Sequence, residues 1–152
     1  MDIYIYIFRI ACALFFGFCI GLERQIRKRN AGLVTNTLVA IGACSFILIS
    51  ETIITASIQA GGPVNNDNLR VLSQVVTGIG FLGAGVILKD GVSIHGLNSA
   101  ATLWCSAAVG CLCGYGLWKE AMVSSIAILI TNWFFKWLEH RLEKRRSEKP
   151  DE

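Results

Sequence analysis

The sequence predicts an all-α membrane protein, a polytopic bundle of five transmembrane helices with the N-terminus outside and the C-terminus in the cytoplasm. Of its 152 residues, 53% are hydrophobic and only 16% are charged, whereas an ordinary soluble domain carries about 25% charged residues. The charges cluster at residues 23–29 and 136–152, which leaves long runs almost free of them. Such runs are typical of a multi-span protein, because one span needs about 20 mostly apolar residues to cross the bilayer.

Five apolar runs meet this requirement, and we take each as one helix. They extend from about Ile3 to Leu22, Leu33 to Ser50, Val71 to Leu88, Leu97 to Leu117 and Ala121 to Leu138. The longest loop follows the second run, and its first part, residues 51–60, could extend the second helix beyond the membrane. The chain therefore divides into a five-span domain over residues 1–139 and a charged cytoplasmic tail over residues 140–152.

The basic residues set the orientation, because cytoplasmic loops carry an excess of Lys and Arg. The loops on one side have only Arg70 and Lys119. The other side has ten basic residues, namely Arg24, Arg27, Lys28, Arg29, Lys89, Arg141, Lys144, Arg145, Arg146 and Lys149. We expect the side with ten to be cytoplasmic. This pattern is explained by membrane topology, so the net charge of +3 gives no reason to predict nucleic-acid binding.

The residues that could carry out chemistry are sparse. All six cysteines lie inside apolar runs, where they are expected to be small packing residues. His95 and His140 have no second ligand at metal-binding spacing, and no pattern of a catalytic triad or a carboxylate pair is present. The expected spans also contain no acidic residue, which argues against a dedicated divalent-cation pore. We therefore predict a non-enzymatic protein without a cofactor or a metal site.

Glycines mark the places where helices are expected to come close together. Gly17 and Gly21 form one GxxxG pair, and Gly110 and Gly114 form another. Small residues at this spacing let membrane helices approach closely, and one such face could also serve a homodimer.

The third run carries four glycines within eight residues: Gly78, Gly80, Gly83 and Gly85. The first three form a literal GxGxxG, but a dinucleotide site needs a strand before it and an acidic residue about 20 positions later. Neither is present in this membrane run. Two interpretations remain open: the glycines allow close helix packing, or the helix unwinds there around an ion or a ligand.

Polar residues form a stripe along the fourth run. Asn98, Thr102 and Ser106 follow at intervals of four, with Cys105 beside the last of them. Asn36, early in the second run, is expected at a similar depth in the membrane. A polar stripe in a membrane helix has to face protein or water. It can form hydrogen bonds between helices, or it can line a groove for a ligand or a partner.

Charged residues near the ends of the spans are further candidates. Arg9 lies about two turns into the first run, and no acidic partner for it is obvious. Its side chain could extend to the outer surface, or it could be a functional charge inside the membrane. Glu23 and Arg24 end the first run, and Lys89 and Asp90 end the third. We expect these four to meet at the cytoplasmic face, as an ion-paired collar or as a surface for a partner protein.

Three segments resemble the MgtC/SapB family of bacterial inner-membrane proteins. They are GLERQIRKRNAGLVTNTLVAIGA at 21–43, QVVTGIGFLGAGVI at 74–87 and HGLNSAATLWCSAAVG at 95–110. The resemblance implies a five-span domain in the inner membrane and a role in magnesium homeostasis, virulence and survival inside macrophages. It also implies that Asn98, Cys105 and Asp90 matter for function. The sequence departs from the family pattern at Val34, where an Arg is usual, and at Ser99, where a Thr is usual.

The resemblance leads to two functional hypotheses. The first is a membrane regulator that contacts another membrane complex, with the F-type ATP synthase as the candidate that the family implies. The second is a small dimeric transporter or channel for an ion or solute, with its site between the glycines of the third run and the Asn98 face. Family members usually carry a soluble domain after the last span, whereas this sequence ends at Glu152, so we expect it to represent the membrane domain alone.

Overall fold

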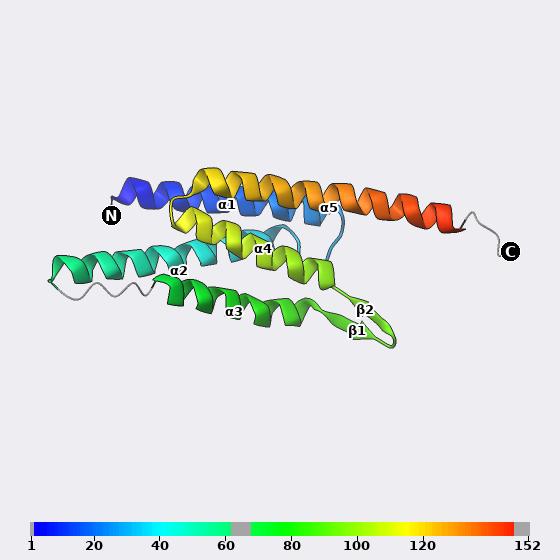
Figure 1. Cartoon of the computed structure of the whole chain (residues 1–152), viewed down its shortest axis with the longest axis horizontal. Helices are drawn as coiled ribbons and strands as arrows, with labels where there is room; N and C mark the ends of the chain where they lie inside the picture. Colours follow the sequence, from blue (N-terminus) through cyan, green and yellow to red (C-terminus); the bar gives the residue numbers. More distant parts are fainter. Residues whose placement is uncertain (1, 62–67, 148–152) are drawn as a thin grey trace.

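The computed structural model describes residues 2–61 and 68–147, apart from the side chains of residues 68, 135–140 and 142–147. The described elements are α1 (Ile3–Ile26), α2 (Leu33–Gln59), α3 (Asn68–Val86), β1 (Leu88–Asp90), β2 (Ser93–His95), α4 (Leu97–Gly114) and α5 (Trp118–Ser147). This confirms the predicted all-α bundle (Figure 1). Helices α1 to α4 are each long and apolar enough to cross a membrane. The use of α5 as a fifth span and the orientation of the termini stay predictions.

Helix boundaries differ from the expected spans mainly by extension. Helix α2 does not end at Ser50 but continues to Gln59, as the sequence allowed. Helix α5 continues to Ser147 and so includes residues 140–147 of the expected tail. The polar loop after α3 is not irregular, because β1 and β2 pair there as an antiparallel hairpin with Asp90 opposite Ser93. Gly91 opens its two-residue turn with a φ of 58°, a conformation that favours glycine.

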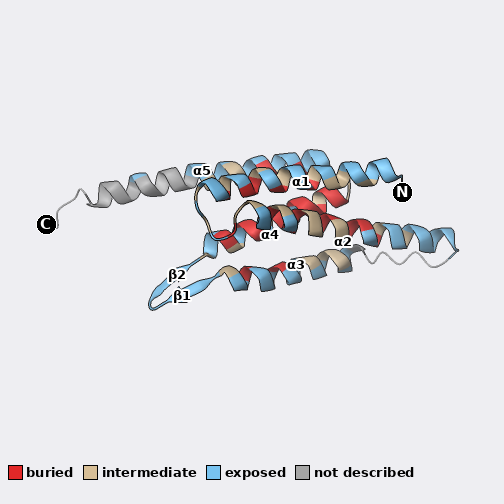
Figure 2. Cartoon of the chain, turned by 180° about the vertical axis from the view of Figure 1, so that it is seen from behind, coloured by how far each residue is buried: buried red, intermediate tan, exposed pale blue. Residues whose placement is uncertain are grey.

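Helices α2 and α4 form the centre of the bundle, between α1 and α5 on one side and α3 on the other (Figure 1). Buried residues gather along these central helices and the inner face of α1 (Figure 2). Ile47 and Leu103 belong to one apolar cluster, which also touches α3. Ile20, Leu48 and Val109 belong to a second, which joins α1, α2 and α4.

Both GxxxG pairs lie against α2. A Cβ atom added at Gly17 would come within 2.8 Å of the Cβ of Ala40, and one at Gly21 would come within 2.7 Å of the Leu33 carbonyl oxygen. A Cβ at Gly110 would collide with the Ala40 carbonyl group from the other side. These glycines therefore let α1 and α4 approach the backbone of α2 more closely than any other residue would allow.

Helix α3 is attached more loosely than its neighbours. Only 11% of its span is buried, compared with 56% of the span in α4. Cβ atoms added at Gly78, Gly80 or Gly85 would meet nothing within 4 Å, and one at Gly83 would make an ordinary contact of 3.5 Å with Ala100. The glycines of α3 are thus not places of close approach within the described chain. They leave open surface on α3 instead.

Candidate functional site

The polar residues converge where α1 ends and where α2 and α4 begin, which we call the hairpin end of the bundle because β1 and β2 project from it (Figure 1). Arg24 is at the centre of this end. Its side chain is only 2% exposed, and its Nη2 donates to Ser99 Oγ at 2.7 Å. Its Nη1 donates to Asn98 Oδ1 at 3.4 Å. Since burying a cation costs several kcal/mol, Arg24 needs these acceptors and the favourable C-terminus of α1.

Asn98 differs from the rest of the polar stripe because it is exposed. Arginine can only donate hydrogen bonds, so the contact with Arg24 turns the Asn98 carbonyl oxygen inward. Thr102 Oγ1 approaches the same oxygen at 3.5 Å. The Asn98 NH₂ group has no hydrogen-bond partner among the described residues. The result is an exposed amide at the start of α4 whose two donors have no partner among the described residues.

Asn36 and Ser106 form a buried link between α2 and α4. Ser106 Oγ donates to Asn36 Oδ1 at 2.8 Å. The Asn36 NH₂ group donates to the carbonyl oxygens of Gly32, at 2.8 Å, and Ala31, at 3.1 Å. Every polar atom of the Asn36 side chain therefore has a partner, and the residue fixes the connection between α1 and α2. These hydrogen bonds give Asn36 a structural role, and its place on a functional face stays a prediction.

Thr102 and Cys105 lie on either side of the same helix face. Thr102 is buried and donates to the Asn98 backbone carbonyl at 2.8 Å. Cys105 is half-buried and is a free thiol. The structure therefore brings Asn98, Thr102 and Ser106 onto one face of α4, but only Asn98 is available at the surface.

The expected collar of four charged residues does not form. Glu23 instead pairs with Arg27 one turn later in α1, at 2.6 Å. Lys89 and Asp90 lie on the exposed hairpin and form no ion pair with a described residue. The reason is the hairpin itself, which carries both side chains beyond the helix ends. Asp90 is consequently a surface residue near the tip of the hairpin, opposite Ser93, and not a partner of Arg24.

The opposite end of the bundle contains an ion pair that the sequence did not suggest. Arg9 Nη1 pairs with Glu51 and also donates to the Gly114 carbonyl oxygen at 2.8 Å. The pair forms because α2 continues past Ser50 and keeps Glu51 on a helix facing α1. It joins α1, α2 and α4 away from the hairpin end.

The described residues contain no cluster of three or more His, Cys, Asp or Glu side chains placed to hold a metal ion. The arrangement at the hairpin end suits recognition of a hydrogen-bond acceptor. It presents an amide donor pair at a fixed position, supported by a buried guanidinium and flanked by an exposed hairpin.

Comparisons with known proteins agree with the resemblance of the three segments. The MgtC family model matches residues 10–141. Protein MgtC of Salmonella typhimurium is 47% identical over 139 residues, which cover 91% of this chain and 56% of that protein. Protein MgtC of Brucella abortus is 49% identical over 134 residues, which cover 88% of this chain and 52% of that protein.

A protein of Synechocystis sp. that carries no functional name is 50% identical over 126 residues, or 82% of this chain and 49% of its own length. The chain thus spans about half the length of the curated relatives it matches. No solved structure matches it. The family model and the identities over most of the chain lead to one conclusion: the chain belongs to the MgtC family.

Proposed function

We propose that the chain is a non-enzymatic regulator in a bacterial inner membrane that acts by contacting another membrane complex. Its role would be adaptation to low magnesium and survival inside host cells, and the F-type ATP synthase is the first candidate for the partner. The family resemblance suggests this role and this partner. The observation that carries the proposal is the exposed Asn98 amide, whose oxygen accepts from the buried Arg24 and whose donors have no partner among the described residues.

The geometry at the hairpin end supports a contact surface, because the fold buries the Arg24 cation at a cost in free energy and so fixes the start of α4. Arg24 could reach solvent if it were an ordinary end-of-helix cation, but it is buried against α4. There it orients Asn98 and anchors Ser99, so the start of α4 has one defined position. An amide with unused donors at this place can bind a backbone carbonyl or a carboxylate of a neighbouring membrane helix.

The transporter hypothesis receives less support from the same residues. A transport site at Gly80, Gly83 and Asn98 would need a polar cavity there. Two grooves along the described part of α3 are lined mainly by apolar residues, and neither includes any of these three. The central polar contact, from Ser106 to Asn36, is a direct hydrogen bond of 2.8 Å with no room for an ion between the two atoms.

ATP-driven proton pumping in inverted membrane vesicles tests the proposal. Vesicles containing the wild-type chain should pump more slowly than vesicles without it, and Asn98→Ala should restore the rate. Thr77→Ala is the matched control, because Thr77 is an exposed polar residue on the neighbouring α3. Equal rates with wild type, with Asn98→Ala and without the protein would rule out this partner. Ion or solute flux in proteoliposomes containing only this chain would favour the transporter instead.

A further inference from the structure

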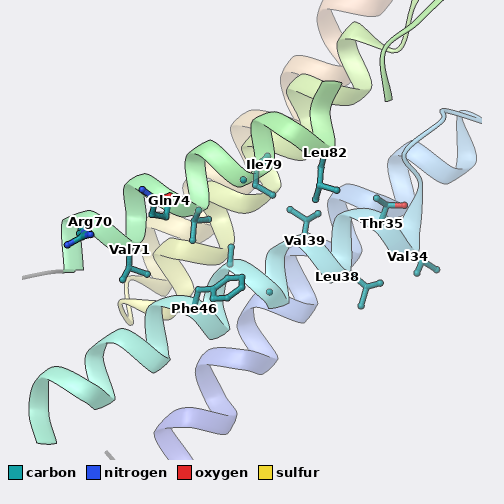
Figure 3. A pocket seen from close by; sticks show the side chains of 14 residues that line it. Val34, Thr35, Leu38, Val39, Phe46, Arg70, Val71, Gln74, Ile79 and Leu82 are labelled. Carbon is teal, nitrogen blue, oxygen red and sulfur yellow. The ribbon is translucent and has the colours of Figure 1, made fainter. Parts of the chain in front are cut away.

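A groove runs along the bundle between α2 and α3 (Figure 3). Its volume is about 770 Å³, and its walls are almost entirely apolar, with Leu38, Phe46 and Leu82 among the exposed side chains that line it. Gly42 and Gly78 leave it deep, because nothing lies within 4 Å of where their Cβ atoms would be. Both helices belong to the candidate membrane spans, so the groove faces lipid.

The groove is polar at one end. Figure 3 shows Arg70 and Gln74 at the end near the start of α3, and Val34 and Thr35 at the other. Arg70 is exposed and forms no ion pair with a described residue. A cation at the end of an apolar channel matches a molecule with a negative head and a hydrocarbon tail.

The length of the groove distinguishes between a lipid chain and a helix as its occupant. Its lining runs from Val34 to Phe46 on α2 and from Arg70 to Leu82 on α3. Each stretch covers roughly 18 Å at 1.5 Å per residue. That is close to one leaflet of a hydrocarbon core of about 30 Å, whereas a partner helix has to cross the whole core.

We propose that the groove between α2 and α3 binds an acyl chain of an anionic phospholipid whose phosphate contacts Arg70 and Gln74. The guanidinium of Arg70 supplies charge and paired donors for a phosphate, and the Gln74 amide supplies a further donor. The chain lies along Leu38 and Leu82 over the open backbone at Gly42 and Gly78. This lipid would fill the space that separates α3 from α2 and hold α3 in its position.

Native mass spectrometry of the full chain in detergent tests the proposal. The chain is titrated with phosphatidylglycerol or with phosphatidylcholine of identical acyl chains. We expect one phosphatidylglycerol to bind about fivefold more tightly than phosphatidylcholine, which corresponds to about 1 kcal/mol for one cation at an anionic head group. Arg70→Gln should remove this preference, while Lys89→Gln, on the exposed hairpin, should preserve it.

Two leucine substitutions in α3 separate binding in the groove from general lipid contact. Gly78→Leu places a side chain inside the groove and should reduce the binding of both lipids at least tenfold. Gly80→Leu makes the same change on the opposite face of α3, outside the groove, and should bind like wild type. Neither Cβ meets an atom within 4 Å, so both variants are expected to fold.

Three results would overturn the proposal. The first is equal binding of the two lipids by wild type and Arg70→Gln. The second is unchanged lipid binding by Gly78→Leu. The third is a groove filled by a second copy of the protein. In that case the wild type would form a dimer, Gly78→Leu would abolish it, and the wild-type monomer would retain no lipid.

Discussion

At the scale of single residues, the buried Arg24 connects the packing of the bundle to its candidate contact surface. It is the only link that the described contacts show between the end of α1 and both Asn98 and Ser99. The Asn98 oxygen accepts a hydrogen bond from Arg24, whereas its NH₂ group has no partner among the described residues and is available to another protein. A change at Arg24 should therefore affect both folding and function, whereas a change at Asn98 should affect mainly function, because Arg24 keeps its shorter hydrogen bond to Ser99.

Arg24→Ala should lower the free energy of unfolding by about 1–3 kcal/mol, because it leaves the buried Ser99 hydroxyl without its donor. Arg24→Lys keeps the positive charge but loses the second donor group. Its free energy of unfolding should therefore lie between those of wild type and Arg24→Ala. Asn98→Ala removes only the longer hydrogen bond of Arg24, at 3.4 Å, and should cost less than Arg24→Ala. The control Lys89→Ala is on an exposed side chain and should change stability by less than about 0.5 kcal/mol. Thermal unfolding of the solubilised protein measures these differences. An Arg24→Ala variant as stable as wild type would remove Arg24 from its proposed structural role.

A second residue-scale prediction concerns the pair of Arg9 and Glu51. Because the two side chains contact each other and hold α1 against α2, their substitutions should not be additive. A double-mutant cycle with Arg9→Ala and Glu51→Ala should give a coupling energy of about 1–3 kcal/mol in unfolding experiments. Additive effects would mean that the pair contributes nothing beyond the separate contacts of each residue, such as that of Arg9 with Gly114.

At the scale of helices, the glycines fall into two groups with opposite expected behaviour. Gly17, Gly21, Gly110 and Gly114 allow α1 and α4 to lie directly on α2. Gly78, Gly80 and Gly85 have open space where a Cβ would be. Glycine is therefore required for packing in the first group, whereas in the second it meets no neighbour among the described residues.

Gly110→Ala should destabilise the protein by about 1–3 kcal/mol, because its methyl group would collide with the backbone of Ala40. Gly80→Ala should be neutral or stabilising by up to about 1 kcal/mol, since alanine favours a helix and meets no neighbour here. Unfolding midpoints of the two variants, measured under identical detergent conditions, provide the comparison. A destabilised Gly80→Ala would show that the open face of α3 is covered by something outside the described chain.

The sequence predicted the helices well and their contacts less well, for a physical reason. Apolar runs and basic loops depend on composition, so the positions of α1 to α4 followed from counting residues. The sequence allowed the second helix to continue over residues 51–60, as α2 does to Gln59, but it did not show which residue Glu51 contacts. Its partner Arg9 is 42 residues away, and only tertiary packing brings the two together. Likewise, a glycine has the same appearance in a sequence whether its face is covered or open.

At the scale of the whole molecule, the bundle has two ends with different chemistry. The hairpin end contains Arg24, Asn98 and the projecting hairpin, whereas the other end contains the Arg9–Glu51 pair. The basic residues predict that the hairpin end is cytoplasmic. Both GxxxG pairs are occupied by α2 within one chain. The predicted homodimer would therefore need a different surface.

Labelling of an introduced cysteine tests the predicted orientation. Val92 is fully exposed at the tip of the hairpin, so Val92→Cys should react readily with a membrane-impermeant thiol reagent. The reaction should occur in inverted vesicles and not in intact cells, because the tip is expected in the cytoplasm. The six native cysteines are half-buried or buried, and unmodified protein supplies the background. Labelling of Val92→Cys in intact cells would reverse the predicted topology.

Photo-cross-linking from position 97 tests most directly whether this end of the bundle contacts a membrane complex. A photoreactive amino acid replaces Leu97, the exposed neighbour of Asn98, in cells that contain the F-type ATP synthase, and the same residue at Thr77 serves as the control. The account predicts an adduct between position 97 and a membrane subunit of the synthase, and only lipid adducts from position 77. Lipid adducts alone from both positions would contradict it.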